Sequence, residues 1–146
     1  MKMKKVISFS LWGDDPRYTA GAYRNVDLAA DCYPGWICRF HVGKTTPVDV
    51  LEYLAAQDNV ELVPRPEECN WTGMFWRFED AADPNVEMMI SRDCDSRLTY
   101  REAAAVQEWA HGDKGFHISR NSYYGGYVGG KTGHHPRNAG SYSQIC

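Results

Sequence analysis

Val86-Glu-Met-Met-Ile-Ser-Arg-Asp-Cys-Asp-Ser-Arg97 is the stretch of sequence from which the fold can be predicted. Its first half, Val86 to Ile90, is a short apolar run suited to a buried strand. The segment from Thr99 to His111 then predicts a helix, with Thr99 and Glu102 spaced as a capping box. A buried strand that ends in two carboxylates places hard oxygen ligands at the carboxyl edge of a sheet, where open α/β sheets bind their ligands.

The two carboxylates belong to Asp93 and Asp95, which share one face of an extended chain because they are two residues apart. Neighbouring carboxylates remain ionised most readily when a cation lies between them. Mg²⁺ or Mn²⁺ fits this role, because a hard cation takes one or two protein carboxylates together with substrate phosphates. Arg92 and Arg97 flank the pair and would add charge for a diphosphate. A surface turn in which Asp and Arg neutralise each other is the alternative, and the buried strand before the pair favours the metal site.

The composition limits the classes of protein to which the chain can belong. Its 146 residues suffice for one domain with a core, and 43% of them are hydrophobic. The net charge of −3 and the lack of a basic stripe exclude a nucleic-acid partner. No apolar run approaches the roughly 20 residues of a membrane span. The five cysteines form no C-x-x-C pair, which favours reduced thiols in a cytoplasm, that of the host for a viral protein.

Strand and helix patterns alternate along the first 120 residues. The predicted strands lie at 5–12, 36–42, 60–63, 86–90 and 115–119, and the predicted helices at 20–33, 46–58, 73–82 and 99–111. Strands that alternate with helices imply parallel pairing and an α/β, Rossmann-like layered sheet.

The pattern ends at Asn121. The segment from there to Cys146 holds six glycines and hardly any aliphatic residues, so it can bury little surface. We therefore divide the chain into an α/β domain of residues 1–120 and a glycine-rich flexible tail of residues 121–146.

Several short motifs occur together in an order that is typical of one group of enzymes. They are Ser10-Leu-Trp-Gly13, Tyr33-Pro-Gly-Trp36, Met74-Phe-Trp-Arg-Phe78, Ser91-Arg-Asp-Cys-Asp-Ser-Arg97, Arg101-Glu102, Ala105-Val-Gln-Glu-Trp109 and Phe116-His-Ile118. Over roughly residues 5–120 the chain resembles glycosyltransferases of the glycosyltransferase-A type, from bacterial surface polysaccharide synthesis and from large viruses and phages.

The resemblance implies a mostly parallel sheet flanked by helices and a metal-dependent transfer of sugar from a nucleoside diphosphate to a glycan acceptor. Asp93 and Asp95 would match the family's D-x-D pair and hold Mn²⁺ or Mg²⁺ against the donor diphosphate. Such a cation stabilises the departing nucleoside diphosphate as a Lewis acid. The residues expected at the donor site are Leu11, Trp12, Gly13, Arg77, Arg92, Asp93, Asp95 and Arg97.

The chain departs from the family pattern after Ile118. Family members usually continue with Arg-Asp-His-Pro, whereas Asn121 stands here where an acid is expected. They also run on through an acceptor-binding half, so the resemblance predicts a fold truncated on its carboxyl side. The alternative function is therefore a non-catalytic or hydrolytic nucleotide-sugar-binding remnant. A nucleotidyltransferase or phosphatase is a third candidate, disfavoured because no glycine-rich phosphate loop follows the first strand. The sequence leaves open the catalytic base and the oligomeric state, and a homo-oligomer is compatible with it.

Overall fold

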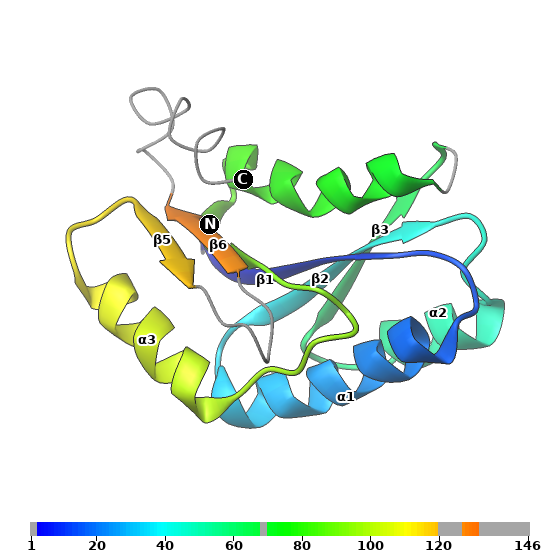
Figure 1. Cartoon of the computed structure of the whole chain (residues 1–146), viewed down its shortest axis with the longest axis horizontal. Helices are drawn as coiled ribbons and strands as arrows, with labels where there is room; N and C mark the ends of the chain where they lie inside the picture. The colour runs from blue at the N-terminus through cyan, green and yellow to red at the C-terminus, as the bar shows by residue number, and fades with distance from the viewer. Residues whose placement is uncertain (1–2, 68–69, 120–126, 132–146) are drawn as a thin grey trace.

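The computed structural model describes residues 3–67, 70–119 and 127–131, which form a six-stranded sheet in the order β3-β2-β1-β4-β6-β5, flanked by helices (Figure 1). The strands are β1 (Lys4–Leu11), β2 (Ile37–Gly43), β3 (Val60–Arg65), β4 (Val86–Ser91), β5 (Phe116–Ser119) and β6 (Tyr127–Lys131). The helices are α1 (Pro16–Cys32), α2 (Val48–Ala55), the 3₁₀ helix η1 (Trp71–Ala82) and α3 (Tyr100–His111). None of the helices in these described ranges is both long and apolar enough to cross a membrane.

The predicted mostly parallel α/β sheet is confirmed. Strands β1 to β4 pair in parallel, and β6 is antiparallel to both β4 and β5. Strand β5 therefore runs in the same direction as β4, although β6 lies between them.

Strand β6 corrects the prediction of a tail that begins at residue 121. Tyr127–Lys131 lies inside the sheet, and the remaining residues of the predicted tail fall outside the described part of the chain. Strand β6 has no apolar side-chain period, and its backbone hydrogen bonds hold it in the sheet. Gly129 is required in β6 because neighbouring atoms approach its backbone closely. A Cβ at Gly129 would lie 3.0 Å from the Trp109 ring and 3.1 Å from the Met89 carbonyl oxygen.

Local signals set the first turns of the helices. The carboxylate of Asp15 accepts a hydrogen bond from the Arg17 amide at 2.9 Å, so α1 begins at Pro16, four residues before the predicted start. The hydroxyl of Thr99 accepts from the Glu102 amide at 3.2 Å, as the capping-box spacing predicts.

One face of the sheet is apolar and packs against α1, α2 and α3 (Figure 1). Phe9 of β1 and Phe40 of β2 stack there with their ring centroids 4.7 Å apart. The two-residue period of a strand sends alternate side chains to this face. The main contributors are Ile7, Phe9, Leu11, Ala22, Val26, Ala29, Phe40, Leu54, Met88, Ile90, Leu98, Val106 and Trp109.

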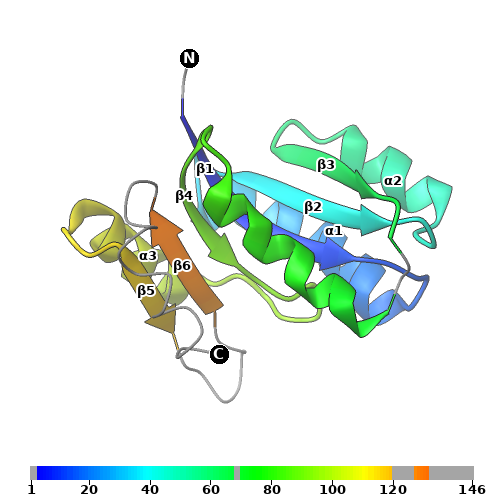
Figure 2. The same ribbon diagram turned by 90° about the horizontal axis from the view of Figure 1, so that it is seen from above.

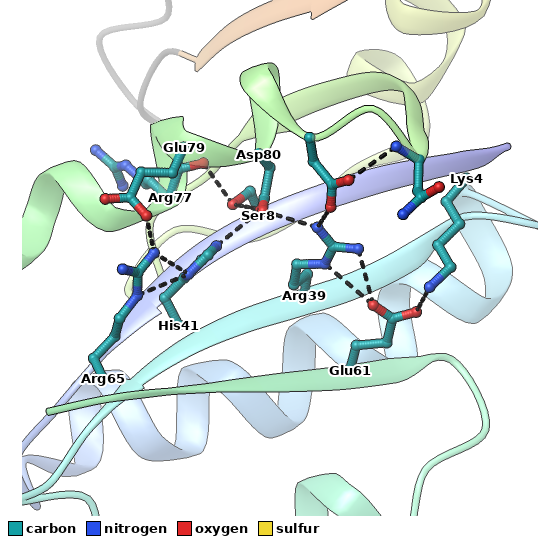
Figure 3. A network of polar contacts seen from close by, with 11 residues as sticks. Lys4, Ser8, Arg39, His41, Glu61, Arg65, Arg77, Glu79 and Asp80 are labelled. Carbon is teal, nitrogen blue, oxygen red and sulfur yellow. Dashed lines mark hydrogen bonds and ion pairs between the residues drawn. The ribbon is translucent and has the colours of Figure 1, made fainter.

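The other face of the sheet is largely polar and is covered by η1, which crosses the strands in Figure 2. Asp80 of η1 is buried, and its carboxylate accepts hydrogen bonds from Ser8 of β1 and from Arg39 of β2, the latter at 2.9 Å (Figure 3). Arg65 of β3 donates to Nδ1 of His41, 3.0 Å away. Since Nδ1 is an acceptor, the proton of the imidazole lies on Nε2, which donates to Asp80 at 3.0 Å.

These contacts tie η1 to three neighbouring strands. Hydrogen bonds from Ser8, His41 and Arg39 keep the pKa of Asp80 below its usual value, although burial opposes them. An ionised carboxylate in this position is stable only while its partners remain, so η1 sits in one orientation on the sheet.

Candidate functional site

The strand order places a switch point between β1 and β4. From β1 the chain proceeds outward through α1 to β2 and through α2 to β3, and η1 then returns it to β4 on the other side of β1. Loops that leave neighbouring strands in opposite directions open a crevice at the carboxyl ends of those strands. A cavity of about 410 Å³ lies there. It is lined by Ser10, Leu11, Trp12, Tyr18, Met74, Arg77, Asp93 and Asp95.

The turn after β4 presents both carboxylates to this cavity. The amide of Arg92 still pairs with the Ser8 carbonyl at 2.9 Å, and the chain then turns, with the Ser96 amide donating to the Asp93 carbonyl at 3.1 Å. Between the two acids, Cys94 is buried, and burial is the main cause that raises the pKa of its thiol. Cys94 is therefore a core thiol and does not act as a nucleophile at neutral pH.

Helix α1 supports this turn from behind. The Asn25 side chain donates to the Ser96 carbonyl at 2.8 Å and accepts from the Leu98 amide at 3.1 Å. Gly21, one turn earlier, packs directly against the turn, because a Cβ there would lie 2.0 Å from the Cys94 carbonyl oxygen. The position of the two carboxylates thus depends on close contact with α1.

Arg77 connects η1 to the same turn. Its guanidinium forms an ion pair with Asp93 and donates to the Arg92 carbonyl at 3.0 Å. Its amide donates to the Ser10 hydroxyl at 3.2 Å, and its carbonyl oxygen lies 2.7 Å from the Ser8 hydroxyl, whose single proton it shares with the Asp80 carboxylate. Arg77 is therefore held between β1 and β4, with its positive charge at the wall of the cavity.

The donor set suits a hard divalent cation. Asp93 and Asp95 line one cavity and could offer oxygen ligands, and no group of three His, Cys, Asp or Glu side chains gathers here or anywhere else in the described ranges. Mg²⁺ and Mn²⁺ bind with one or two carboxylates when phosphates and water complete the shell. Zinc, by contrast, takes at least three protein ligands. The two residues predicted as metal ligands thus fit Mg²⁺ or Mn²⁺ with a phosphate substrate.

The end of β1 forms the apolar wall of the cavity. Trp12 lies edge-on against Trp76 at a centroid distance of 5.7 Å. The Trp12 ring also packs against Gly73, where it leaves no room for a side chain. Gly13 has φ of 77° and donates its amide to Thr45 at 2.9 Å, so it turns the chain without lining the cavity itself. Leu11 and Trp12 line the cavity, and Gly13, which was expected beside them, does not.

Two of the predicted donor-site residues point elsewhere. Arg92 is only 1% exposed, and its guanidinium lies 3.1 Å from the Glu102 carboxylate and donates to the Arg97 carbonyl at 3.1 Å. Arg97 donates to the carbonyls of Cys94 and Ser96 at 3.4 and 3.2 Å. Neither arginine lines the cavity: Arg92 holds the turn from its inner side, whereas Arg97 is exposed and braces the same turn from outside.

Glu102 is the buried partner of Arg92. Burial raises the pKa of its carboxyl, and Arg92 opposes that rise.

The cavity also contains two residues that the sequence analysis did not predict, Tyr18 from α1 and Met74 from η1. The sequence holds no local signal for either, because only the packing of the two helices brings them to this edge.

Comparison with known proteins supports the fold. No family model matches the sequence, and no curated protein does. Among solved structures, the chain is similar to 4-diphosphocytidyl-2C-methyl-D-erythritol synthase from Anaerococcus prevotii, with TM-score 0.61 and 11% identity over 98% of this chain and 76% of that one. Rv0371c from Mycobacterium tuberculosis gives TM-score 0.60 and 9% identity over 99% and 82%.

A third similar structure is a protein from Desulfovibrio desulfuricans that is described as a nucleotide-diphospho-sugar transferase. Its TM-score is 0.54, at 13% identity over 90% of this chain and 64% of that one. At such low identity these similarities establish a shared α/β fold and leave the chemistry to be argued from the cavity.

Proposed function

We propose that this protein is a transferase that binds a nucleoside-diphosphate sugar at the carboxyl ends of β1 and β4, with a divalent cation held by Asp93 and Asp95. The observation that carries the proposal is that two carboxylates and the Arg77 guanidinium meet at one cavity, at the switch point of the sheet. The motif resemblance supports a sugar donor and a glycan acceptor.

Five residues of the cavity would have defined tasks. Asp93 and Asp95 hold the cation, which when bound stabilises the departing diphosphate as a Lewis acid. Arg77, now paired with Asp93, would donate to a phosphate oxygen once that carboxylate turns to the cation. Trp12 and Tyr18 offer aromatic surface to the nucleobase, and base stacking on such rings tolerates any base.

A second candidate is a donor-binding protein that releases the sugar slowly to water. Inverting transfer needs a general base near the acceptor hydroxyl. Among the described residues that line the cavity, the only carboxylates are Asp93 and Asp95, which the proposal assigns to the cation.

Calorimetry tests the proposal. UDP, GDP, CDP and dTDP are titrated with Mn²⁺ and with EDTA into the wild type, Asp93→Asn, Asp95→Asn and the control Asp113→Asn, which follows α3 and does not line the cavity. We expect at least one nucleotide to bind in a Mn²⁺-dependent manner, with about tenfold or greater loss in the two site variants. Equal affinity in all four proteins would refute the cation role. Donor turnover with and without glycan then separates transfer from hydrolysis.

A further inference from the structure

Helix η1 differs from an ordinary surface helix because large apolar side chains lie on its solvent side. Its inner side buries Trp76 and the charged Asp80, whereas its outer side leaves Trp71, Met74 and Phe75 exposed by 69%, 50% and 57%. Trp71 and Phe75 contact each other edge-on with their ring centroids 6.1 Å apart. Single exposed apolar side chains are ordinary, but a contiguous group of large ones marks an interaction site. We call these three residues the η1 aromatic face.

The η1 aromatic face is continuous with the candidate site. Met74 belongs to this face and also lines the cavity. Arg77, one 3₁₀ turn further along η1, pairs with Asp93. The helix is seated firmly here, since a Cβ at Gly73 would lie 2.9 Å from the Trp12 ring. A molecule on the η1 aromatic face would therefore lie next to whatever occupies the cavity.

The size of the face disfavours a second copy of the chain as its occupant. A whole aromatic side chain presents roughly 150–250 Å², so the exposed parts of these three side chains amount to roughly 300–400 Å². A stable protein interface needs about 800 Å² from each partner.

The charge disfavours a lipid surface. Helices that lie on membranes carry several Lys or Arg residues on their polar side. The only Lys or Arg within Trp71–Ala82 is Arg77, which is paired with Asp93, and the carboxylate of Glu79 is paired with Arg65 of β3. Because Arg77 and Glu79 are each paired within the fold, η1 has no cationic side that would attract anionic headgroups. A neutral ligand with apolar C–H surface and hydroxyl groups fits better, because its C–H groups pack on aromatic rings and its hydroxyls donate to carboxylates.

We propose that Trp71, Met74 and Phe75 form a carbohydrate-binding surface that holds the glycan acceptor beside the donor cavity. The acceptor role rests on the proposed function, whereas binding of carbohydrate to the η1 aromatic face does not. Flat sugar faces stack on the Trp71 and Phe75 rings, and Met74 forms the border between acceptor and donor.

The test follows the indole N–H signals of the five tryptophans by NMR while maltohexaose, cellohexaose, chitohexaose and mannohexaose are titrated into the full chain. The Trp71 signal is assigned by its loss in Trp71→Ala. We expect at least one oligosaccharide to shift it. Calorimetry with that oligosaccharide should then show about tenfold or greater loss of affinity in Trp71→Ala and in Phe75→Ala. Tyr100→Ala is the matched control, because Tyr100 is 70% exposed but lies on α3.

The outcomes separate this inference from the proposed function. If an oligosaccharide shifts Trp71 but no nucleoside diphosphate binds, the carbohydrate surface stands and the transferase proposal fails. If none of the four oligosaccharides shifts Trp71, the carbohydrate surface is refuted. It is also refuted if the Trp71 signal responds instead to anionic vesicles, or if sedimentation shows a dimer that Trp71→Ala dissociates. Unchanged indole signals of the other four tryptophans in Trp71→Ala confirm that the variant is folded.

Discussion

Replacing Gly21 by alanine tests whether α1 sets the position of the two carboxylates. The new Cβ would lie 2.0 Å from the Cys94 carbonyl oxygen and 3.1 Å from the Arg97 guanidinium. Restoring the 3.4 Å of ordinary contact to the carbonyl requires about 1.4 Å of movement. Because the nearest atom is backbone, either α1 or the turn that bears Asp93 and Asp95 must move.

Two opposing terms determine the change in stability. Alanine in a helix interior gains about 1 kcal/mol over glycine. Overpacking costs about 1–3 kcal/mol, and a contact this short with backbone belongs at or above the upper end of that range. We therefore expect Gly21→Ala to lower the free energy of unfolding by about 2 kcal/mol. The displaced carboxylates should also weaken Mn²⁺-dependent nucleotide binding, since a misplacement of about 1 Å can reduce catalysis about 100-fold.

Urea unfolding and calorimetry measure the two effects. The midpoint should fall at an unchanged m-value, which reports a change in stability rather than in compactness. Gly112→Ala is the control, because its Cβ would meet nothing closer than 3.5 Å. Wild-type stability together with wild-type nucleotide affinity in Gly21→Ala would refute the view that α1 presses on the turn.

Three further substitutions test the interior of the fold. Arg92→Met should cost about 3–5 kcal/mol by leaving Glu102 buried and unpaired, while the double variant with Glu102→Leu should recover most of that loss in urea unfolding. Burial already raises the folded-state pKa of Glu102, so its contribution to stability is present at low pH and is lost as pH rises through that pKa. This loss should be larger in Arg92→Met and extend to higher pH, because Arg92 no longer lowers the pKa of Glu102, and a pH-independent difference from wild type would contradict it. Gly129→Ala should cost about 1–3 kcal/mol, whereas a value within about 0.5 kcal/mol would mean that β6 does not pack in the sheet. Lys131→Met should cost about 1 kcal/mol by removing the hydrogen bonds to the Trp109 and Gly112 carbonyls at the end of α3, and no change in urea midpoint would show that these bonds contribute nothing.

Much of the site could be predicted from the sequence because its signals are local. An apolar run from Val86 to Ile90 followed by two acids predicts a buried strand with carboxylates at its end, and the structure places Asp93 and Asp95 on one cavity. The spacing of Thr99 and Glu102 predicts a helix cap, and the hydrogen bond is present. Each of these features depends on residues within a few positions of one another.

The roles of the charged side chains could not be predicted in this way. Arg92 and Arg77 are both arginines near the same acids, yet one is buried against Glu102 and the other pairs with Asp93 at the cavity. Glu102 serves two roles, since its amide completes the helix cap while its carboxylate faces Arg92. The spacing of Thr99 and Glu102 predicts the helix cap, but it does not predict the contact between the Glu102 carboxylate and Arg92.

The sequence by itself therefore determined the alternation of strands and helices, the class of the sheet and the acidic turn after β4, because hydrophobic period and capping act over a few residues. Only the tertiary structure decided that Tyr127–Lys131 enters the sheet and that Gly21 and Asn25 hold the turn. It also decided that η1 buries Asp80 and exposes Trp71. These features depend on which segments meet across the fold. Strand pairing and the burial of charge are settled by partners distant in sequence, and a local pattern does not record them.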